Sequence, residues 1–184
     1  MNGNLPLMRF LISAFAILLF ASAIQAQTIS INGDNSRRIL RWEDFTGTPD
    51  GSANLDAYTY WNIYYNWDAF PFKGDTAKIN VLVKFELGKN SWRKQEKVND
   101  SLLEHEQGHF NIGLLCAIAF QKRINATILF RNNYQSRIKE IFNEELEKYR
   151  QMEELYDKET NHYFNRVQQK KWDQLLKKEL ENRQ

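Results

Sequence analysis

The sequence predicts an α+β fold in which a β-rich N-terminal half precedes a helical C-terminal half. Two observations support this division. Residues 79–86 alternate between apolar and other side chains, as expected for a strand with one buried face. From about residue 100 onward, apolar residues recur at the three- and four-residue spacing of a helix. We therefore expect a small sheet packed on a central helix, followed by long C-terminal helices.

The N-terminal half contains four candidate strands. Residues 28–31 alternate weakly before a turn at Asn32, and residues 38–42 form a second short candidate. Residues 56–67 are dense in aromatic side chains, which suits a half-buried strand. The clearest pattern covers residues 79–86, whose apolar face consists of Ile79, Val81, Val83 and Phe85.

The C-terminal half contains three candidate helices. Asp100 or Ser101 can cap the first of them, because short polar side chains satisfy the free N–H groups of a first helical turn. Residues 114–120 are apolar almost all the way round, as expected for a helix at the centre of a domain. The three helices are expected over about residues 100–124, 134–158 and 162–181.

The first 26 residues have the pattern of a secretory signal peptide. Arg9 is their one charged residue, residues 10–24 are apolar, and small residues follow up to Ala26. A retained membrane anchor is the alternative, but the apolar run is shorter than the ~20 residues that span a bilayer. We expect cleavage after Ala26, a secreted or periplasmic protein without stable membrane insertion, and a single domain over residues 27–184.

The composition limits the partners of the mature chain. Without Arg9 it has 24 basic and 23 acidic residues, a formal charge of +1, which gives no reason to expect nucleic acid. Its one cysteine, Cys116, cannot form an internal disulfide and lies in an apolar helical stretch, so a buried, inert thiol is expected. No feature of the sequence specifies an oligomeric state.

The segment from His105 to His109 is an HExxH pattern within the first predicted helix. Residues four apart lie on the same helix face, so these two imidazoles can bind one tetrahedral Zn²⁺ at about 2.0–2.1 Å. Glu106 beside them can act as a general base toward a water that the metal activates. The alternative is a surface helix with two incidental histidines. However, the chain has only three histidines, and two of them stand at this spacing.

A catalytic zinc site has three protein ligands and one open position. His162 is the favoured third ligand because it lies at a break between helices, and the carboxylates of Asp157 and Glu154 are the alternatives. Tyr156 is a candidate to donate a hydrogen bond to a developing oxyanion, with core packing as its other interpretation. The strand at residues 79–86 either lies along the cleft and pairs with an extended substrate or is an ordinary interior strand.

Three segments in order carry a resemblance to a known family. They are residues 40–45 with Gly47 and Pro49; residues 103–110; and Tyr156-Asp157 followed by Thr160, His162, Gln168 or Gln169, and Trp172. In these segments the chain resembles bacterial predicted secreted zinc-dependent proteases that are catalogued as a domain of unknown function. The resemblance implies a zincin-like α+β domain with zinc on His105 and His109 and with Glu106 as catalytic base. In such proteins a small residue, often glycine, is expected after the last histidine, whereas this chain has Tyr163.

The leading hypothesis is a secreted zinc metallopeptidase that acts on peptides or proteins and uses Glu106 as general base. A second hypothesis is a non-catalytic zinc-binding protein of the cell envelope that presents its charged C-terminal helices to a partner. A third is a zinc amidase that acts on cell-wall peptides. The intact Glu106 favours the first hypothesis, because a zinc-binding protein without catalysis does not need the base.

Overall fold

A computed structural model describes residues 28–183 of the chain; the expected signal peptide, residues 1–26, lies outside the described residues. The architecture is α+β, with a small sheet and three helices, as predicted. In chain order the elements are β1 (Thr28–Ile31), β2 (Ala57–Tyr58), β3 (Trp61–Trp67), β4 (Thr76–Ala77), β5 (Val81–Leu87), β6 (Trp92–Arg93), α1 (Asp100–Ala126), β7 (Leu129–Phe130), α2 (Tyr134–Thr160) and α3 (Arg166–Glu181), with 3₁₀ turns at Trp42–Asp44 and Gln95–Lys97.

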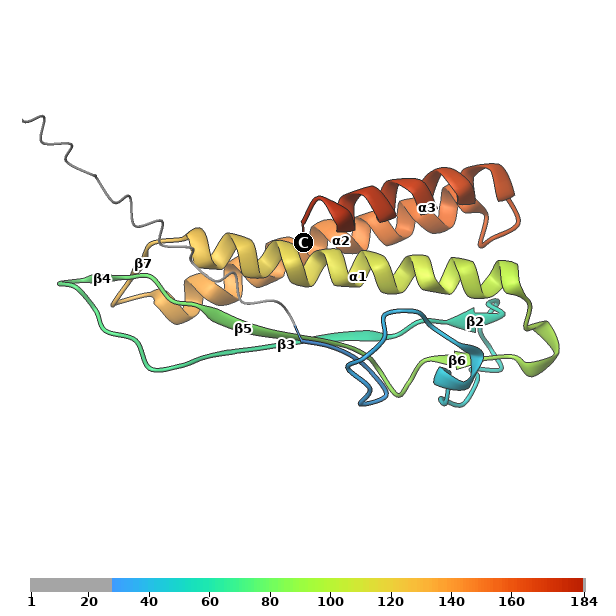
Figure 1. Ribbon diagram of the computed structural model, residues 1–184, viewed down its shortest axis with the longest axis horizontal. Helices are drawn as coiled ribbons and strands as arrows, with labels where there is room; N and C mark the ends of the chain where they lie inside the picture. The colour runs from blue at the N-terminus through green and yellow to red at the C-terminus, as the bar shows by residue number, and fades with distance from the viewer. Residues whose placement is uncertain (1–27, 184) are drawn as a thin grey trace, which may run out of the picture.

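Helix α1 is the middle layer of the fold. The three-stranded sheet covers one side of it, and α2 and α3 cover the other (Figure 1). A helix covered on two sides must be apolar over most of its circumference, which is the pattern predicted for residues 114–120. Those residues are buried apart from the partly exposed Ala119.

The main sheet has the strand order β1-β5-β3, with β5 parallel to β1 and antiparallel to β3. Both edges of β5 are therefore occupied, and its side chains from Val81 to Leu87 alternate toward α1. The segment 79–86 is thus an interior strand, the second of its two interpretations. Among the described residues, β3 is an edge strand whose other side has no partner strand.

Two predicted strands are wrong. Residues 38–42 form no strand, because side chains satisfy their backbone: Gln107 Oε1 accepts from Leu40 N at 2.7 Å, and Asp44 Oδ2 accepts from Arg41 N at 2.7 Å. Residues 56–67 form two strands rather than one. The break falls where Tyr60 turns to pair with the 88–91 loop: Ser91 Oγ accepts from Tyr60 N, and Gly88 N donates to Tyr60 O.

The helices match the prediction more closely than the strands do. Helix α1 begins at Asp100, and its cap is Asn99, one residue before the first of the two proposed caps, because Asn99 Oδ1 accepts from Leu102 N at 2.9 Å. Helix α3 begins at Arg166 rather than near residue 162, because residues 161–163 all have positive φ and cannot continue a right-handed helix. No helix within residues 28–183 combines the length and the apolar character needed to cross a membrane.

Two buried clusters hold the layers together. The larger one lies between the sheet and α1 and continues to the start of α2; the smaller one joins α1, α2 and α3. Cys116 belongs to the smaller cluster, and burial raises the pKa of its thiol to about 12, as expected for an inert thiol. The N-terminal end of α1 lies beside this cluster and carries the HExxH segment.

Candidate metal centre

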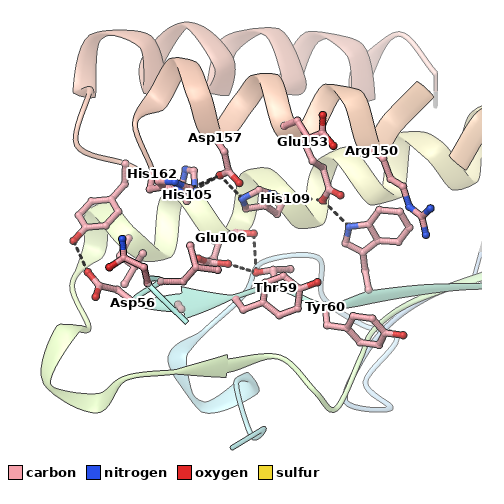
Figure 2. A pocket seen from close by; sticks show the side chains of 18 of the residues that line it. Asp56, Thr59, Tyr60, His105, Glu106, His109, Arg150, Glu153, Asp157 and His162 are labelled. Atoms are coloured by element: carbon pink, nitrogen blue, oxygen red, sulfur yellow. Dashed lines mark hydrogen bonds and ion pairs between the residues drawn. The ribbon is translucent and has the colours of Figure 1, made fainter. Parts of the chain in front are cut away.

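His105 and His109 lie one helical turn apart on α1, and both imidazoles face one carboxylate of α2. His105 Nε2 lies 3.1 Å from Asp157 Oδ1, and His109 Nε2 lies 3.0 Å from the same oxygen. Figure 2 shows the three side chains converging between the two helices. The predicted pair of histidines is therefore accompanied by Asp157, one of the two carboxylates considered for the third ligand.

His162 reaches the same carboxylate from the turn after α2. Its Nδ1 lies 3.4 Å from Asp157 Oδ1, while about half of its side chain is exposed. His105, Asp157 and His162 each offer one ligand atom, and these atoms lie within 4.8 Å of one another. Glu154 lines the cleft nearby, but among the described residues it makes no ion pair with the three histidines.

The distances from Asp157 Oδ1 to the three imidazoles are those expected between two ligands of one tetrahedral ion. Ligand atoms at 2.0–2.1 Å from a tetrahedral Zn²⁺ lie about 3.3 Å from one another. The separations of the three imidazole nitrogens from Asp157 Oδ1 are 3.0, 3.1 and 3.4 Å. Nitrogen and carboxylate oxygen are also the donors that zinc prefers. The donor chemistry therefore fits a zinc ion, and the separations from Asp157 Oδ1 match those within a tetrahedral ligand set.

The far nitrogen of each helical imidazole also has an acceptor. Gln169 Oε1 lies 3.2 Å from His105 Nδ1, and Glu153 Oε1 lies 3.4 Å from His109 Nδ1. An acceptor at Nδ1 favours the tautomer that carries its proton there, which leaves the Nε2 lone pair free for a metal. Both Nε2 atoms are the ones that face Asp157.

Without a bound cation, the surroundings of His109 favour its protonated form. Burial acts to lower the pKa of His109, but hydrogen bonds to Asp157 and Glu153 outweigh it and raise that pKa from 6.5 to about 10. Burial likewise acts to raise the pKa of Asp157, yet hydrogen bonds from His105 and His109 hold it below its ordinary value of 3.8. The site thus favours a positive charge beside Asp157, which either protons or a metal ion can supply.

Glu106 is held next to the two histidines by a residue from the opposite wall. Thr59, in the break between β2 and β3, donates its hydroxyl to Glu106 Oε2 at 2.6 Å. Both side chains are buried, and Glu106 lines the same cleft as His105 and His109. This cleft has a volume of about 830 Å³ and lies between the 54–63 segment and the exposed face of α2 (Figure 2).

Tyr156 lies behind the histidines rather than in the cleft. It is fully buried, its ring stacks on His105 with centroids 4.7 Å apart, and its hydroxyl donates to the backbone oxygen of His105 at 3.0 Å. Gly108 permits this approach, since a Cβ there would overlap the Tyr156 hydroxyl. The geometry supports the packing interpretation of Tyr156 and offers no oxyanion contact for it.

The turn that carries His162 has an unusual backbone. Asn161, His162 and Tyr163 have φ values of +47°, +50° and +80°, in the region that favours glycine. Tyr163 thus adopts a glycine-like conformation at the position where a small residue was expected. Its hydroxyl donates to Asp56 Oδ2 at 3.1 Å, which ties the turn to the opposite wall of the cleft.

The structure adds three residues that the sequence analysis did not assign to the site. Glu153 also accepts from Trp61 Nε1 at 2.9 Å, Thr59 holds Glu106, and Gln169 contacts His105. Glu153 stands four residues before Asp157, a helical spacing that could have indicated a shared face. Thr59 has only its polarity as a signal, and Gln169 stands in the resemblance only as one of two glutamines without a role, because their contacts cross between distant elements.

Comparison with known proteins places the chain in a family but gives it no function. The family described as a bacterial protein of unknown function (DUF922) matches residues 26–163, which include α1, α2 and all three histidines. Neither the curated proteins nor the solved structures contain a significant match. Because the match covers well over half of the 184 residues, the chain belongs to this bacterial family of unknown function.

Proposed function

We propose that the protein is a secreted or periplasmic zinc metallopeptidase in which His105, His109 and Asp157 hold the ion. One observation carries the proposal: two imidazole nitrogens from one helix meet a single carboxylate oxygen at 3.0 and 3.1 Å, with Glu106 buried beside them. A motif helix packed against a sheet, with its histidines in a cleft, also supports a zincin-like classification.

Each residue of the site would have a different role in peptide-bond hydrolysis. A bound zinc ion would polarise a water molecule and the carbonyl of the bond to be cleaved. Glu106 would accept the proton of that water and later deliver it to the leaving amine. Thr59 would hold the Glu106 carboxylate in one orientation through its 2.6 Å hydrogen bond. Glu153 and Gln169 would keep both imidazoles in the ligating tautomer.

The edge strand β3 supports a peptide substrate. Trp61, Asn62 and Ile63 of β3 line the cleft, and among the described residues no strand pairs with the outer side of β3. An extended peptide can add to such an edge through backbone hydrogen bonds, which are independent of its sequence. We assign the pairing with substrate to β3 and not to β5, because both edges of β5 are already paired with other strands.

One observation favours a second candidate function, a non-catalytic zinc-binding protein of the cell envelope. His162 Nδ1 lies 3.4 Å from Asp157 Oδ1 and can serve as a fourth ligand. A zinc site closed by four protein ligands is structural, whereas a catalytic one keeps a position open for water. The half-exposed His162 side chain and the buried Glu106 favour the catalytic alternative.

The experiment assays the mature wild-type chain and its Glu106→Gln variant side by side, with a library of unstructured peptides as substrate. The zinc-loaded wild type should cleave internal or terminal peptide bonds, and Glu106→Gln should lose this activity while it still binds zinc. Cobalt substitution adds a second readout, because the absorption spectrum distinguishes a closed four-ligand site from one that exchanges water. A zinc-loaded wild type that cleaves no peptide bond would leave the non-catalytic candidate in its place.

A further inference from the structure

The hydrogen bonds behind His105 form a closed chain that extends into α3. Gln169 is fully buried, and its side-chain amide contacts three partners. Its Oε1 lies 3.2 Å from His105 Nδ1, while its Nε2 donates to the Tyr156 hydroxyl at 2.7 Å and to Asp173 Oδ1 at 2.8 Å. Each polar atom of this amide therefore has a defined partner.

The partners determine which way the amide points. The Tyr156 hydroxyl has one proton, and it donates that proton to the backbone oxygen of His105. Toward Gln169 the hydroxyl can therefore only accept, so the amide atom that faces it must be the NH₂ group. The carboxylate of Asp173 on the same side requires a donor as well. Consequently the amide oxygen faces His105.

The orientation of the amide determines the form of the imidazole. An amide oxygen accepts a hydrogen bond and cannot donate one, so His105 Nδ1 must carry a proton. Nε2 lies 3.1 Å from Asp157 Oδ1, to which it can donate a proton when no metal is present, and once that proton is displaced its lone pair is free for a metal ion. Thr160 Oγ1 also lies near Nδ1, but at 3.5 Å and with its own proton donated to Tyr156 O at 2.6 Å.

We propose that Gln169 is a positioning residue that holds His105 in its Nδ1-protonated tautomer and so directs Nε2 at the metal. This inference rests on the proposed zinc site and extends it into α3, beyond the family match that ends at residue 163. Partners that orient a ligating histidine in this way typically change metal affinity by 10- to 100-fold when they are removed. Helix α3 is then part of the metal site rather than only a charged surface.

The test combines Gln169→Met, which keeps the length of the side chain but removes its hydrogen bonds, with the control Gln168→Met at the neighbouring position. Zinc affinity is measured by competition with a chelator, and ¹⁵N NMR of labelled histidine reports the tautomer of the His105 ring. We expect Gln169→Met to weaken zinc binding by roughly 10- to 100-fold. Without Gln169, Asp157 is the acceptor left facing the ring, so metal-free Gln169→Met, at a pH where the ring is neutral, should shift toward the Nε2-protonated tautomer relative to the wild type. Gln168→Met should match the wild type in both measurements.

Unchanged affinity and an unchanged His105 tautomer in Gln169→Met would overturn the inference. If Gln169→Met does not fold, the double variant Gln169→Glu/Asp173→Asn tests the inference instead. This variant keeps a hydrogen-bond acceptor at position 169 toward His105 Nδ1 and places a donor at position 173 toward position 169. That variant should retain the Nδ1-protonated ring and bind zinc at least as tightly as the wild type; loss of either would contradict the inference. A wild type that binds no zinc would overturn the proposed function, while the tautomer in the metal-free chain would still test Gln169.

Discussion

The two ends of α1 are buried by different means. Its C-terminal part buries apolar side chains such as Phe120 and Ile124 against the sheet and α2. Its N-terminal part instead buries His105 and Glu106, each of which has a hydrogen-bond partner on another element. The comparison teaches that one end is stabilised mainly by apolar packing, whereas the other needs hydrogen-bond partners for its buried ionisable groups and a positive charge beside Asp157.

The largest expected effect belongs to the apolar end. Phe120 is fully buried, with its ring 4.9 Å from Tyr65 and 5.2 Å from Phe142 between centroids. Phe120→Ala should lower the free energy of unfolding by about 3–5 kcal/mol, as measured by urea denaturation. Zinc affinity of the folded fraction should stay at the wild-type value. A parallel loss of zinc affinity would show that the two ends of α1 are not independent.

Zinc should stabilise the polar end by mass action. At a free zinc concentration 1,000 times the dissociation constant, the gain in unfolding free energy is about 4 kcal/mol. His109→Ala should abolish this gain, while Phe120→Ala should retain it on a lower baseline. Denaturation with and without a chelator measures both, and an equal gain in wild type and His109→Ala would place the ion elsewhere.

Alanine substitutions at the two buried glycines of α1 compare the part of the helix that carries the site with the part that does not. A Cβ at Gly108 would overlap the Tyr156 hydroxyl, and a Cβ at Gly113 would lie 2.6 Å from the Trp61 ring. Both alanine variants should cost about 1–3 kcal/mol of unfolding free energy, as overpacking typically does. Gly108→Ala should weaken zinc binding more than Gly113→Ala, because Tyr156 supports Gln169 and stacks on His105, whereas Trp61 reaches the site only through Glu153. Equal zinc affinities in the two variants would contradict this difference.

The prediction with the narrowest scope is a pH dependence confined to the metal-free chain. The pKa of His109 rises from 6.5 in the unfolded chain to about 10 in the fold. Its protonation therefore contributes stability that is complete below pH 6.5 and is lost as the pH rises through 10. Metal-free wild type should lose stability over this window, and His109→Ala should show a shallower slope. A slope that is the same in both chains would exclude His109 as its source.

The sequence predicts the local features of the site better than its long-range contacts. The HExxH helix follows from the spacing of His105 and His109 and from the apolar run after them, both of which are local signals. For the third ligand, the sequence favours His162 and offers Asp157 only as an alternative, since the position of this carboxylate between the histidines depends on how α2 packs against α1. Thr59 and Gln169 lie 47 and 64 residues from their partners on α1, and no local pattern indicates such pairs.

The errors in the predicted fold have similar causes. Residues 38–42 are a short candidate strand in the sequence, but the side chains of Gln107 and Asp44 take their backbone hydrogen bonds. The start of α3 was placed too early because three consecutive non-glycine residues adopt positive φ, which propensity does not predict. The positive-φ backbone of residues 161–163 is accompanied by two sets of contacts. Tyr163 contacts Asp56, and Asn165 contacts the end of α2.

The most direct test of the account is a zinc titration of the mature chain at pH 7, with Asp157→Ala compared against Glu154→Ala on the same helix. The account predicts that wild type and Glu154→Ala take up about one ion per chain with similar affinity, because Asp157 is the carboxylate that contacts all three histidines among residues 28–183. Asp157→Ala should bind zinc far more weakly. No zinc uptake by the wild type, or equal affinity in the two variants, would contradict a metal centre at this carboxylate.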